Sequence, residues 1–85
     1  MTPAIYEKQF ETQGGRCAIC HQPERMVLNG RTKRLAIDHD HRTGEIRDLL
    51  CFRCNQILGF SEDSIARLFS AISYLQKHQK VDEVG

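Results

Sequence analysis

The feature that most constrains this chain is a pair of matching cysteine motifs, Cys17-Ala-Ile-Cys20 and Cys51-Phe-Arg-Cys54, separated by thirty residues. Two residues between cysteines allow one tight turn to direct both sulfurs at a single point, and two such turns complete a tetrahedron. The spacing therefore predicts one zinc ion bound by Cys17, Cys20, Cys51 and Cys54. Four protein ligands leave no open coordination position, so we expect a structural zinc. The alternatives are a redox-active pair, disfavoured because no thioredoxin-like βαβ pattern is present, or free cysteines in the core.

Length and hydropathy limit what else the chain can be. With 85 residues it predicts a single domain (1–85) with a limited core, and such chains often need an additional staple. The N-terminus lacks the apolar segment of a secretion signal, and the longest apolar run covers only residues 49–52. We therefore expect a cytoplasmic protein without a membrane span. In that reducing compartment, paired cysteines bind metal more often than they form disulfides.

Charge is distributed unevenly along the sequence. The whole chain carries a net charge of +1, but residues 16–53 hold eight Lys and Arg against five acids. The positive charge therefore lies in the segment that contains the cysteines, as a nucleic-acid-binding protein would require. Four thiolates around one Zn²⁺ would add about −2 locally, so charge permits nucleic-acid binding without proving it.

The first third of the chain predicts one helix and one loop. Thr2-Pro3 suits a helix start, and Gly14-Gly15 suits its stop. Ile5, Tyr6 and Phe10 can share one face of this helix. The first cysteine pair then forms a metal knuckle, and a polar, glycine-containing loop continues to about residue 34.

The middle of the chain predicts a hairpin and a short helix. From residue 35 the sequence alternates, with Leu35, Ile37 and His39 expected on one face of a half-buried strand. Residues 42–45 indicate a turn, and residues 46–50 a returning strand. Residues 51–58 predict a short helix that is closed by Gly59.

The C-terminal part predicts an amphipathic helix. Ser61 is a suitable N-cap, with Glu62 and Asp63 in the first turn. An apolar stripe follows at helical spacing, formed by Ile65, Leu68, Phe69, Ile72 and Leu75. We expect this stripe to cover the core; docking of a partner helix is the alternative. Residues 81–85 are expected to fray.

A reactive cluster lies between the two halves of the cysteine motif, in the run Asp38-His39-Asp40-His41. On a strand His39 and His41 share one face, while Asp38 and Asp40 share the other. Twist at the strand end can bring Asp38 and His39 to a common site. The alternative is a solvated polar strand end with a capping aspartate.

Asn55 directly follows the last cysteine, on the expected short helix. A carboxylate and an amide oxygen suit a hard divalent ion such as Mg²⁺, which keeps most of its waters. The alternative for Asn55 is an ordinary hydrogen bond at a helix end.

These motifs together resemble a known family. The run LAIDHDHRTGEIRDLLCFRCNQILG, with CAIC upstream, resembles the phage recombination endonuclease VII family within the His-Me finger (HNH-type) nucleases. The resemblance covers about residues 16–60. It implies a small α+β zinc-bound domain with a ββα-metal core: two strands within residues 35–50, then the helix that carries Asn55, with a flanking helix at each end.

The resemblance also implies roles for individual residues. His39 is the general base that activates water, and Asp38 and Asn55 hold a catalytic Mg²⁺ or Mn²⁺. His41 contacts the phosphate or assists proton transfer. A histidine side chain, with an ordinary pKa of about 6.5, suits a general base near neutral pH. Arg47, Arg42 and Arg53 are candidates for DNA phosphate contacts; the alternative for each is a solvated surface charge.

We therefore expect a metal-dependent DNA endonuclease of phage or prophage type, acting as a monomer or weak homodimer. Nicking or low-specificity cutting is favoured over the resolution of branched junctions. The alternatives are a non-catalytic zinc-knuckle module that binds nucleic acid, and a structural domain that uses the C-terminal stripe. A general base beside two oxygen ligands favours the enzyme, because a pure binder does not need one.

Overall fold

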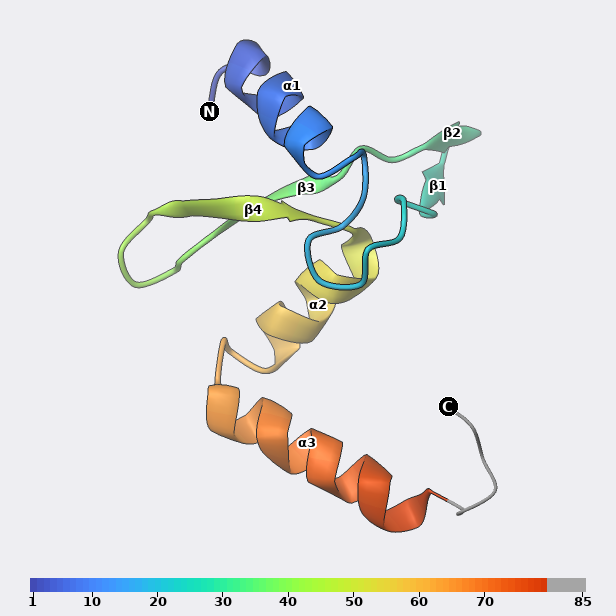
Figure 1. Cartoon of the computed structure of the whole chain (residues 1–85), viewed down its shortest axis with the longest axis vertical. Helices are drawn as coiled ribbons and strands as arrows, with labels where there is room; N and C mark the ends of the chain where they lie inside the picture. Colours follow the sequence, from blue (N-terminus) through green and yellow to red (C-terminus); the bar gives the residue numbers. More distant parts are fainter. Residues whose placement is uncertain (80–85) are drawn as a thin grey trace.

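The computed structural model describes residues 1–79 and contains three helices and two small antiparallel sheets (Figure 1). The elements in chain order are α1 (Pro3–Thr12), β1 (Val27–Leu28), β2 (Arg31–Thr32), β3 (Ala36–His39), β4 (Ile46–Leu50), α2 (Phe52–Phe60) and α3 (Ile65–His78). The fraying expected for residues 81–85 lies outside the described residues. Within residues 1–79, no helix combines the length and the apolar character that crossing a membrane requires.

Helix α1 begins and ends as its sequence predicts. Thr2 is the N-cap, and its hydroxyl oxygen accepts a hydrogen bond from the backbone N–H of Ile5 at 3.2 Å. Gly14 and Gly15 adopt positive φ values of 65° and 73° after the helix, a conformation that glycine adopts without strain. Tyr6 is buried, and its hydroxyl donates to the carbonyl of Leu35 at 2.6 Å. Ile5 is 56% exposed, so the prediction that it shares a face with Tyr6 and Phe10 is wrong.

Strands β3 and β4 form the predicted hairpin. The turn is held by Asp40, whose carboxylate accepts hydrogen bonds from the backbone N–H groups of Arg42 and Thr43 at 2.7 and 3.3 Å. The predicted alternation along β3 is wrong, because Ile37 is 39% exposed whereas Asp38 is only 6% exposed. An irregularity in the register between residues 37 and 39 shifts the facing of these side chains. The strand therefore directs a carboxylate inward.

The structure forms a second hairpin where a loop was expected. Strands β1 and β2 pair around Asn29 and Gly30, which have positive φ values of 53° and 77°. An Asn-Gly pair with this backbone is the favoured two-residue hairpin turn, so the sequence did contain the signal. The expectation of a loop to residue 34 is wrong because strands of two residues are too short to show alternation.

Helix α2 packs against both strands of the β3–β4 hairpin. Cys51 is its N-cap, and the helix continues to Phe60. The predicted stop at Gly59 is wrong, because this glycine lies inside the last turn. Ser61 ends the helix instead, and its buried hydroxyl donates to the carbonyl of Leu58 at 3.1 Å.

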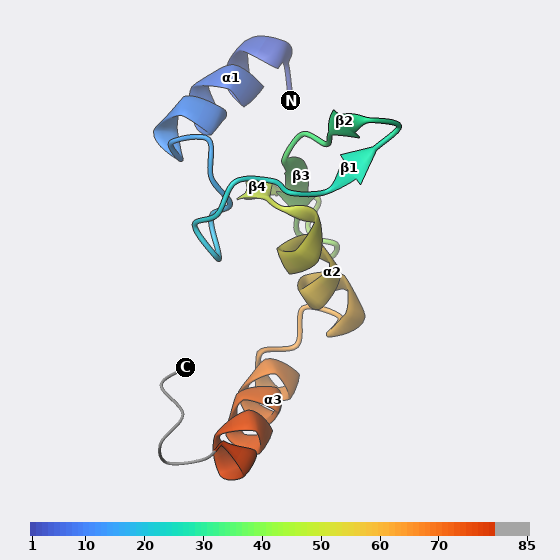
Figure 2. The same ribbon diagram turned by 90° about the vertical axis from the view of Figure 1, so that its right-hand side faces the viewer.

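Helix α3 begins later than expected and does not cover the core. Its N-cap is Ser64, whose hydroxyl oxygen accepts a hydrogen bond from the backbone N–H of Arg67 at 3.1 Å. The prediction of Ser61 as the N-cap is therefore wrong. Glu62 and Asp63 precede the helix with φ values of 56° each, and the chain turns so that α3 extends away from the sheets (Figure 2). Phe69 remains 64% exposed, and α3 packs on no other helix or strand among residues 1–79. The expected covering of the core is therefore wrong, and partner docking remains a prediction.

The core lies between α1, the hairpin and the start of α2. Its buried residues are Tyr6, Cys17, Leu35, Leu49, Leu50, Cys51 and Cys54. Three of the seven are cysteines, so the core and the cysteine cluster are continuous. A core this small is a weak source of stability for a chain of this length, which increases the importance of a bound metal.

Candidate metal centre and hairpin site

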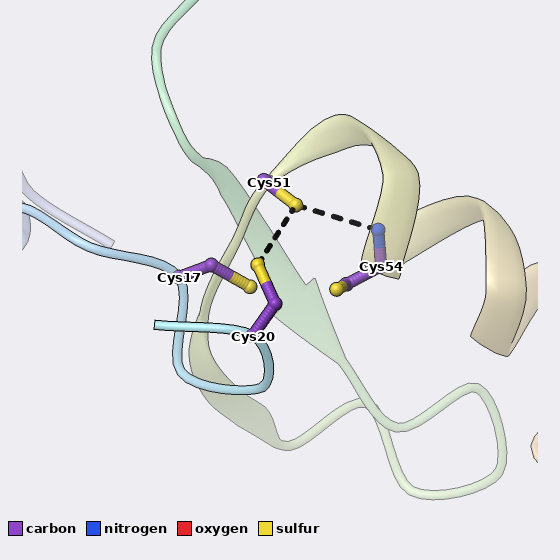
Figure 3. A group of neighbouring side chains, drawn as sticks. All are labelled: Cys17, Cys20, Cys51 and Cys54. Carbon is purple, nitrogen blue, oxygen red and sulfur yellow. Dashed lines mark hydrogen bonds between the residues drawn. The ribbon is translucent and has the colours of Figure 1, made fainter. Parts of the chain in front are cut away.

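The four cysteines meet at one point. Their sulfur atoms all lie within 4.8 Å of one another, and none forms a disulfide (Figure 3). The sulfurs of Cys20 and Cys51 are 3.8 Å apart. Tetrahedral Zn–S bonds of about 2.3 Å place sulfurs roughly 3.8 Å apart, so the spacing fits one such ion. The four cysteines could hold a zinc ion, as the motif predicts.

Local backbone structure positions these sulfurs. The first pair lies on a tight turn in which the N–H of His21 donates to the carbonyl of Cys17 at 2.9 Å. The second pair lies at the start of α2, where the N–H of Cys54 donates to the sulfur of Cys51 at 3.5 Å. Glu24 ties the segment after the first pair to this helix, since its carboxylate accepts from the N–H of Phe52 at 2.8 Å.

The protonation of the thiols indicates how the cluster responds to a cation. Burial raises the pKa of Cys17, but hydrogen bonds from backbone groups of Cys20, Cys51 and Ile19 outweigh it and lower this pKa to about 7. Burial raises the pKa of Cys51 and of Cys54 above the ordinary value. These shifts in pKa favour the thiolate form of Cys17 and the neutral thiol form of Cys51 and Cys54. A divalent cation would stabilise all four as thiolates, which is the usual coupling of metal binding to proton release.

The hairpin contains an ion pair that joins its two strands, between the buried carboxylate of Asp38 and the half-buried guanidinium of Arg47. Arg47 on β4 donates from Nε to Asp38 Oδ2 at 2.6 Å and from Nη2 to Asp38 Oδ1 at 3.2 Å. This hydrogen bonding raises the pKa of Arg47 above its already high ordinary value. Bidentate pairs of this kind are the strong class of charge-assisted hydrogen bonds. The guanidinium predicted to contact phosphate is therefore bound to a carboxylate in this structure.

A second carboxylate, missed by the sequence analysis, joins this pair. Asp63 Oδ2 lies 3.4 Å from Arg47 Nη2 and 3.6 Å from His41 Nδ1. Asp63 comes from the linker between α2 and α3, where its left-handed backbone directs it toward the hairpin. The sequence assigned Asp63 to the first turn of a helix, and no local pattern signals a contact across 16 residues.

The two histidines of the cluster lie together. The rings of His39 and His41 have centroids 4.9 Å apart with an interplanar angle of 51°, in agreement with the expected common face. Both side chains are exposed. Arg47 Nη2 also donates to the carbonyl of His39 at 3.3 Å, which connects the histidine backbone to the ion pair.

The remaining predicted residues lie on the hairpin turn and on α2. Asn55 is half-buried in the first turn of α2, beside Cys54, and α2 contacts β3. Arg42 is exposed on the turn, and Arg53 is exposed on α2. The convergence of Asn55 with Asp38 and His39 on one ion stays a prediction.

Asp40 has a structural task in this cluster. Hydrogen bonds from the backbone N–H groups of Arg42 and Thr43 lower the pKa of its carboxyl. The interpretation of a capping aspartate thus describes Asp40, while Asp38 is the carboxylate directed inward.

Comparisons with a family model and with individual proteins both find similar sequences. Residues 1–77 match the family model of recombination endonuclease VII. The whole chain is 46% identical over 86 aligned positions to the Gene 59 protein of Mycobacterium phage D29, of which it covers 49%. A second relative, the Gene 59 protein of Mycobacterium phage L5, is 44% identical over 81 positions, 94% of this chain and 46% of the relative. The chain thus spans about half the length of these relatives.

Proposed function

Because this chain belongs to the recombination endonuclease VII family, we propose that it is a metal-dependent endonuclease that hydrolyses phosphodiester bonds in DNA. The observation that carries the proposal is the end of β3, where a nearly buried carboxylate, Asp38, precedes an exposed imidazole, His39. The order of the elements here, two antiparallel strands followed by α2, supports our proposal of a ββα-metal core of the HNH type. We take residues 1–85 as one such domain.

In this proposal His39 accepts a proton from a water molecule that attacks the phosphorus in line with the leaving oxygen. The P–O bond to one sugar breaks, the departing oxygen takes up a proton from solvent water, and His39 later returns its proton to the solvent. His41, next to His39, contacts the phosphate. General bases of this kind contribute typically 10²–10⁴-fold to rate.

Asp38 and Asn55 are the proposed ligands of a catalytic Mg²⁺ or Mn²⁺. A carboxylate and an amide oxygen are a suitable donor pair for a hard cation. The ion, when bound, stabilises negative charge on the phosphate and on the leaving oxygen. Arg47 shares the Asp38 carboxylate, whose two oxygens have further lone pairs available for a cation.

The four cysteines have a separate task. We assign them one structural zinc ion, because four thiolate ligands leave no position for substrate or water. Its place between the first knuckle and the N-terminus of α2 would fix that helix, and with it Asn55, against the hairpin.

One observation favours a second candidate, a zinc-knuckle module that binds nucleic acid without cutting it. Arg47 already neutralises Asp38, and a guanidinium at 2.6 Å opposes the approach of another cation. A non-catalytic module would keep this pair permanently, whereas a nuclease must admit an ion beside it.

Cleavage of supercoiled plasmid decides between these candidates. We expect the purified, zinc-loaded protein to convert the plasmid to nicked circles with Mg²⁺ or Mn²⁺ and to leave it intact without added divalent ion. Direct linearisation would indicate a dimer, and nicking alone a monomer. An intact plasmid under all conditions, despite measurable DNA binding, would leave the binding module as the function.

The metal ligands are tested by their concentration dependence. We expect Asn55→Ala to raise the Mg²⁺ concentration needed for half-maximal cutting, while Gln56→Ala, its exposed neighbour, leaves it unchanged. Asp38→Ala should act in the same direction but also releases Arg47, so Asn55 provides the cleaner comparison. An unchanged requirement in Asn55→Ala would remove this residue from the metal site.

The phage origin of the relatives supports a phage or prophage protein that acts in the cytoplasm of a bacterial host. Low-specificity nicking is the activity we favour, because within residues 1–79 no helix with an evident base-reading pattern lies beside the site. Arg42 and Arg53 remain candidates for phosphate contacts on the hairpin turn and on α2.

A further inference from the structure

The segment that forms the β1–β2 hairpin has an unusual charge. Residues 25–35 contain four cations and no acidic residue. Three of these cations, Arg25, Arg31 and Lys33, lie with exposed side chains on or directly beside the two short strands. The catalytic proposal uses none of them.

The two acidic residues that contact this segment, Glu24 and Glu7, form no ion pair with these three cations. Glu24 uses one carboxylate oxygen for the backbone N–H groups of Arg25 and Met26, both at 3.0 Å, and the other for the start of α2. Glu7 pairs with the fourth cation, Arg34, at 3.2 Å, and Arg34 also lies over the Tyr6 ring. Among residues 1–79 no carboxylate forms an ion pair with Arg25, Arg31 or Lys33, so the hairpin presents these positive charges to the solvent.

The hairpin projects from the body of the molecule, at the end of the β3–β4 pair opposite to its turn (Figure 1). Two exposed aliphatic side chains, Val27 and Leu28, lie on it at 58% and 59% exposure. A pair of two-residue strands is marginal alone. Here its base is fixed by Glu24 and by the hydrogen bond from the N–H of Lys33 to the carbonyl of Met26 at 2.7 Å.

A hollow lies between this hairpin and α2. Its volume is about 660 Å³, and its lining includes Arg25 and Val27 from the hairpin side and Phe52 and Arg53 from the helix. Glu24 and three cysteines of the metal centre, Cys20, Cys51 and Cys54, line it as well. The guanidinium groups of Arg25 and Arg53 suit a phosphate, whereas Glu24 and the sulfurs do not, so the basic side chains carry the argument and the hollow itself does not. Lys33 Nζ borders the same helix, 5.2 Å from the Phe52 ring.

We propose that the β1–β2 hairpin is a DNA-backbone contact surface, with Arg25, Arg31 and Lys33 binding phosphates apart from the cutting site. The proposal rests on the proposed function for its partner, DNA. Contacts of this kind are independent of sequence and are recognised by their salt dependence, since each neutralised phosphate contributes about 0.9 to the slope of log K against log salt.

The test measures binding of a labelled 30-base-pair duplex by fluorescence anisotropy without added divalent ion, so that no cutting is required. The hairpin variant carries Arg25→Gln, Arg31→Gln and Lys33→Gln. The matched control carries Lys8→Gln, Arg67→Gln and Lys77→Gln, which removes the same charge from α1 and α3. Arg53 is left unchanged because it borders the cysteine cluster. Zinc content and circular dichroism confirm that both variants are folded.

We expect the hairpin variant to lose roughly eightfold in affinity for each phosphate contact at 0.1 M salt and to reduce the salt slope by about 2–3. The control should keep the parental slope within about 1. Equal losses of affinity in both variants would show that only net charge matters and would overturn the proposal. A hairpin variant that binds the duplex as tightly as the parent would overturn it too. A parent that binds in this way but never cuts would contradict the endonuclease alone.

Discussion

At the scale of single residues, the ion pair between Asp38 and Arg47 is the least expected contact of the site. Both residues occur in the sequence as candidates for separate roles, one for a metal and one for phosphate. Their pairing depends on the register of β3 and β4 and on the irregularity beside Asp38, neither of which a pattern of residue types specifies. The position of Asp63 was even harder to predict from the sequence, because the conformation of a linker brings it to Arg47 and His41.

The pair predicts a measurable effect of Arg47→Met. The variant leaves the Asp38 carboxylate, 6% exposed, without its cation. Loss of a charged partner should lower the free energy of unfolding by about 1–3 kcal/mol. Chemical denaturation of the zinc-loaded protein measures this, with Arg42→Met on the exposed turn as the control.

Addition of Mn²⁺ gives this experiment a second readout. If Asp38 is an ion ligand, Mn²⁺ should restore part of the stability lost in Arg47→Met, because a cation replaces the missing guanidinium. A variant as stable as the parent would show that the Asp38–Arg47 ion pair does not contribute to the free energy of unfolding. A destabilised variant that does not respond to Mn²⁺ would argue against Asp38 as a ligand.

At the scale of elements, the sequence predicted the parts whose ends are marked by local chemistry. Thr2-Pro3 and the two glycines bound α1, and the turn at residues 42–45 bounds the β3–β4 hairpin. The junction between α2 and α3 was misassigned because Ser61 and Ser64 are both acceptable caps. Only the packing of Ser61 under α2 decides which helix it serves.

Among the elements, the prediction that the apolar stripe of α3 covers the core differed most from the structure. Helical spacing shows that a face is apolar, but it does not show what covers that face. The two left-handed residues in the linker direct α3 away from the sheets, and no helical pattern contains that information.

The position of α3 predicts that Phe69→Ser has little effect on the stability of the domain. Phe69 is 64% exposed and belongs to a helix that packs on no other described element, so the melting temperature should stay near that of the parent. Leu49→Ala is the contrasting variant, since Leu49 is fully buried and its truncation should cost about 2–5 kcal/mol. Thermal unfolding of dilute zinc-loaded protein compares them, and a large loss in Phe69→Ser would show that α3 supports the core.

At the scale of the whole molecule, the cysteine cluster joins segments that are thirty residues apart in the chain. This part of the site could be predicted from spacing alone, because each Cys-x₂-Cys turn can direct two sulfurs at one ion and two such turns complete its coordination. The core beside it is small and includes three of the same cysteines. Folding is therefore expected to depend on the metal.

Cys17→Ser tests this dependence. We expect the variant to lose zinc and most of its helical circular dichroism signal, because Cys17 is both a ligand and 1% exposed within the core. His21→Asn is the control: it keeps all four thiols, and asparagine tolerates the left-handed backbone at that position. A Cys17→Ser protein that melts normally and is helical without zinc would refute a structural metal.

The most direct test of the central claim is the rate at which zinc-loaded His39→Ala nicks supercoiled plasmid in saturating Mg²⁺, compared with the parent. His39 is exposed, so its removal should leave the zinc content and the fold unchanged. We expect a loss of at least about 100-fold in rate, in the range that a general base contributes. A folded His39→Ala protein that cuts at the parental rate would contradict the account.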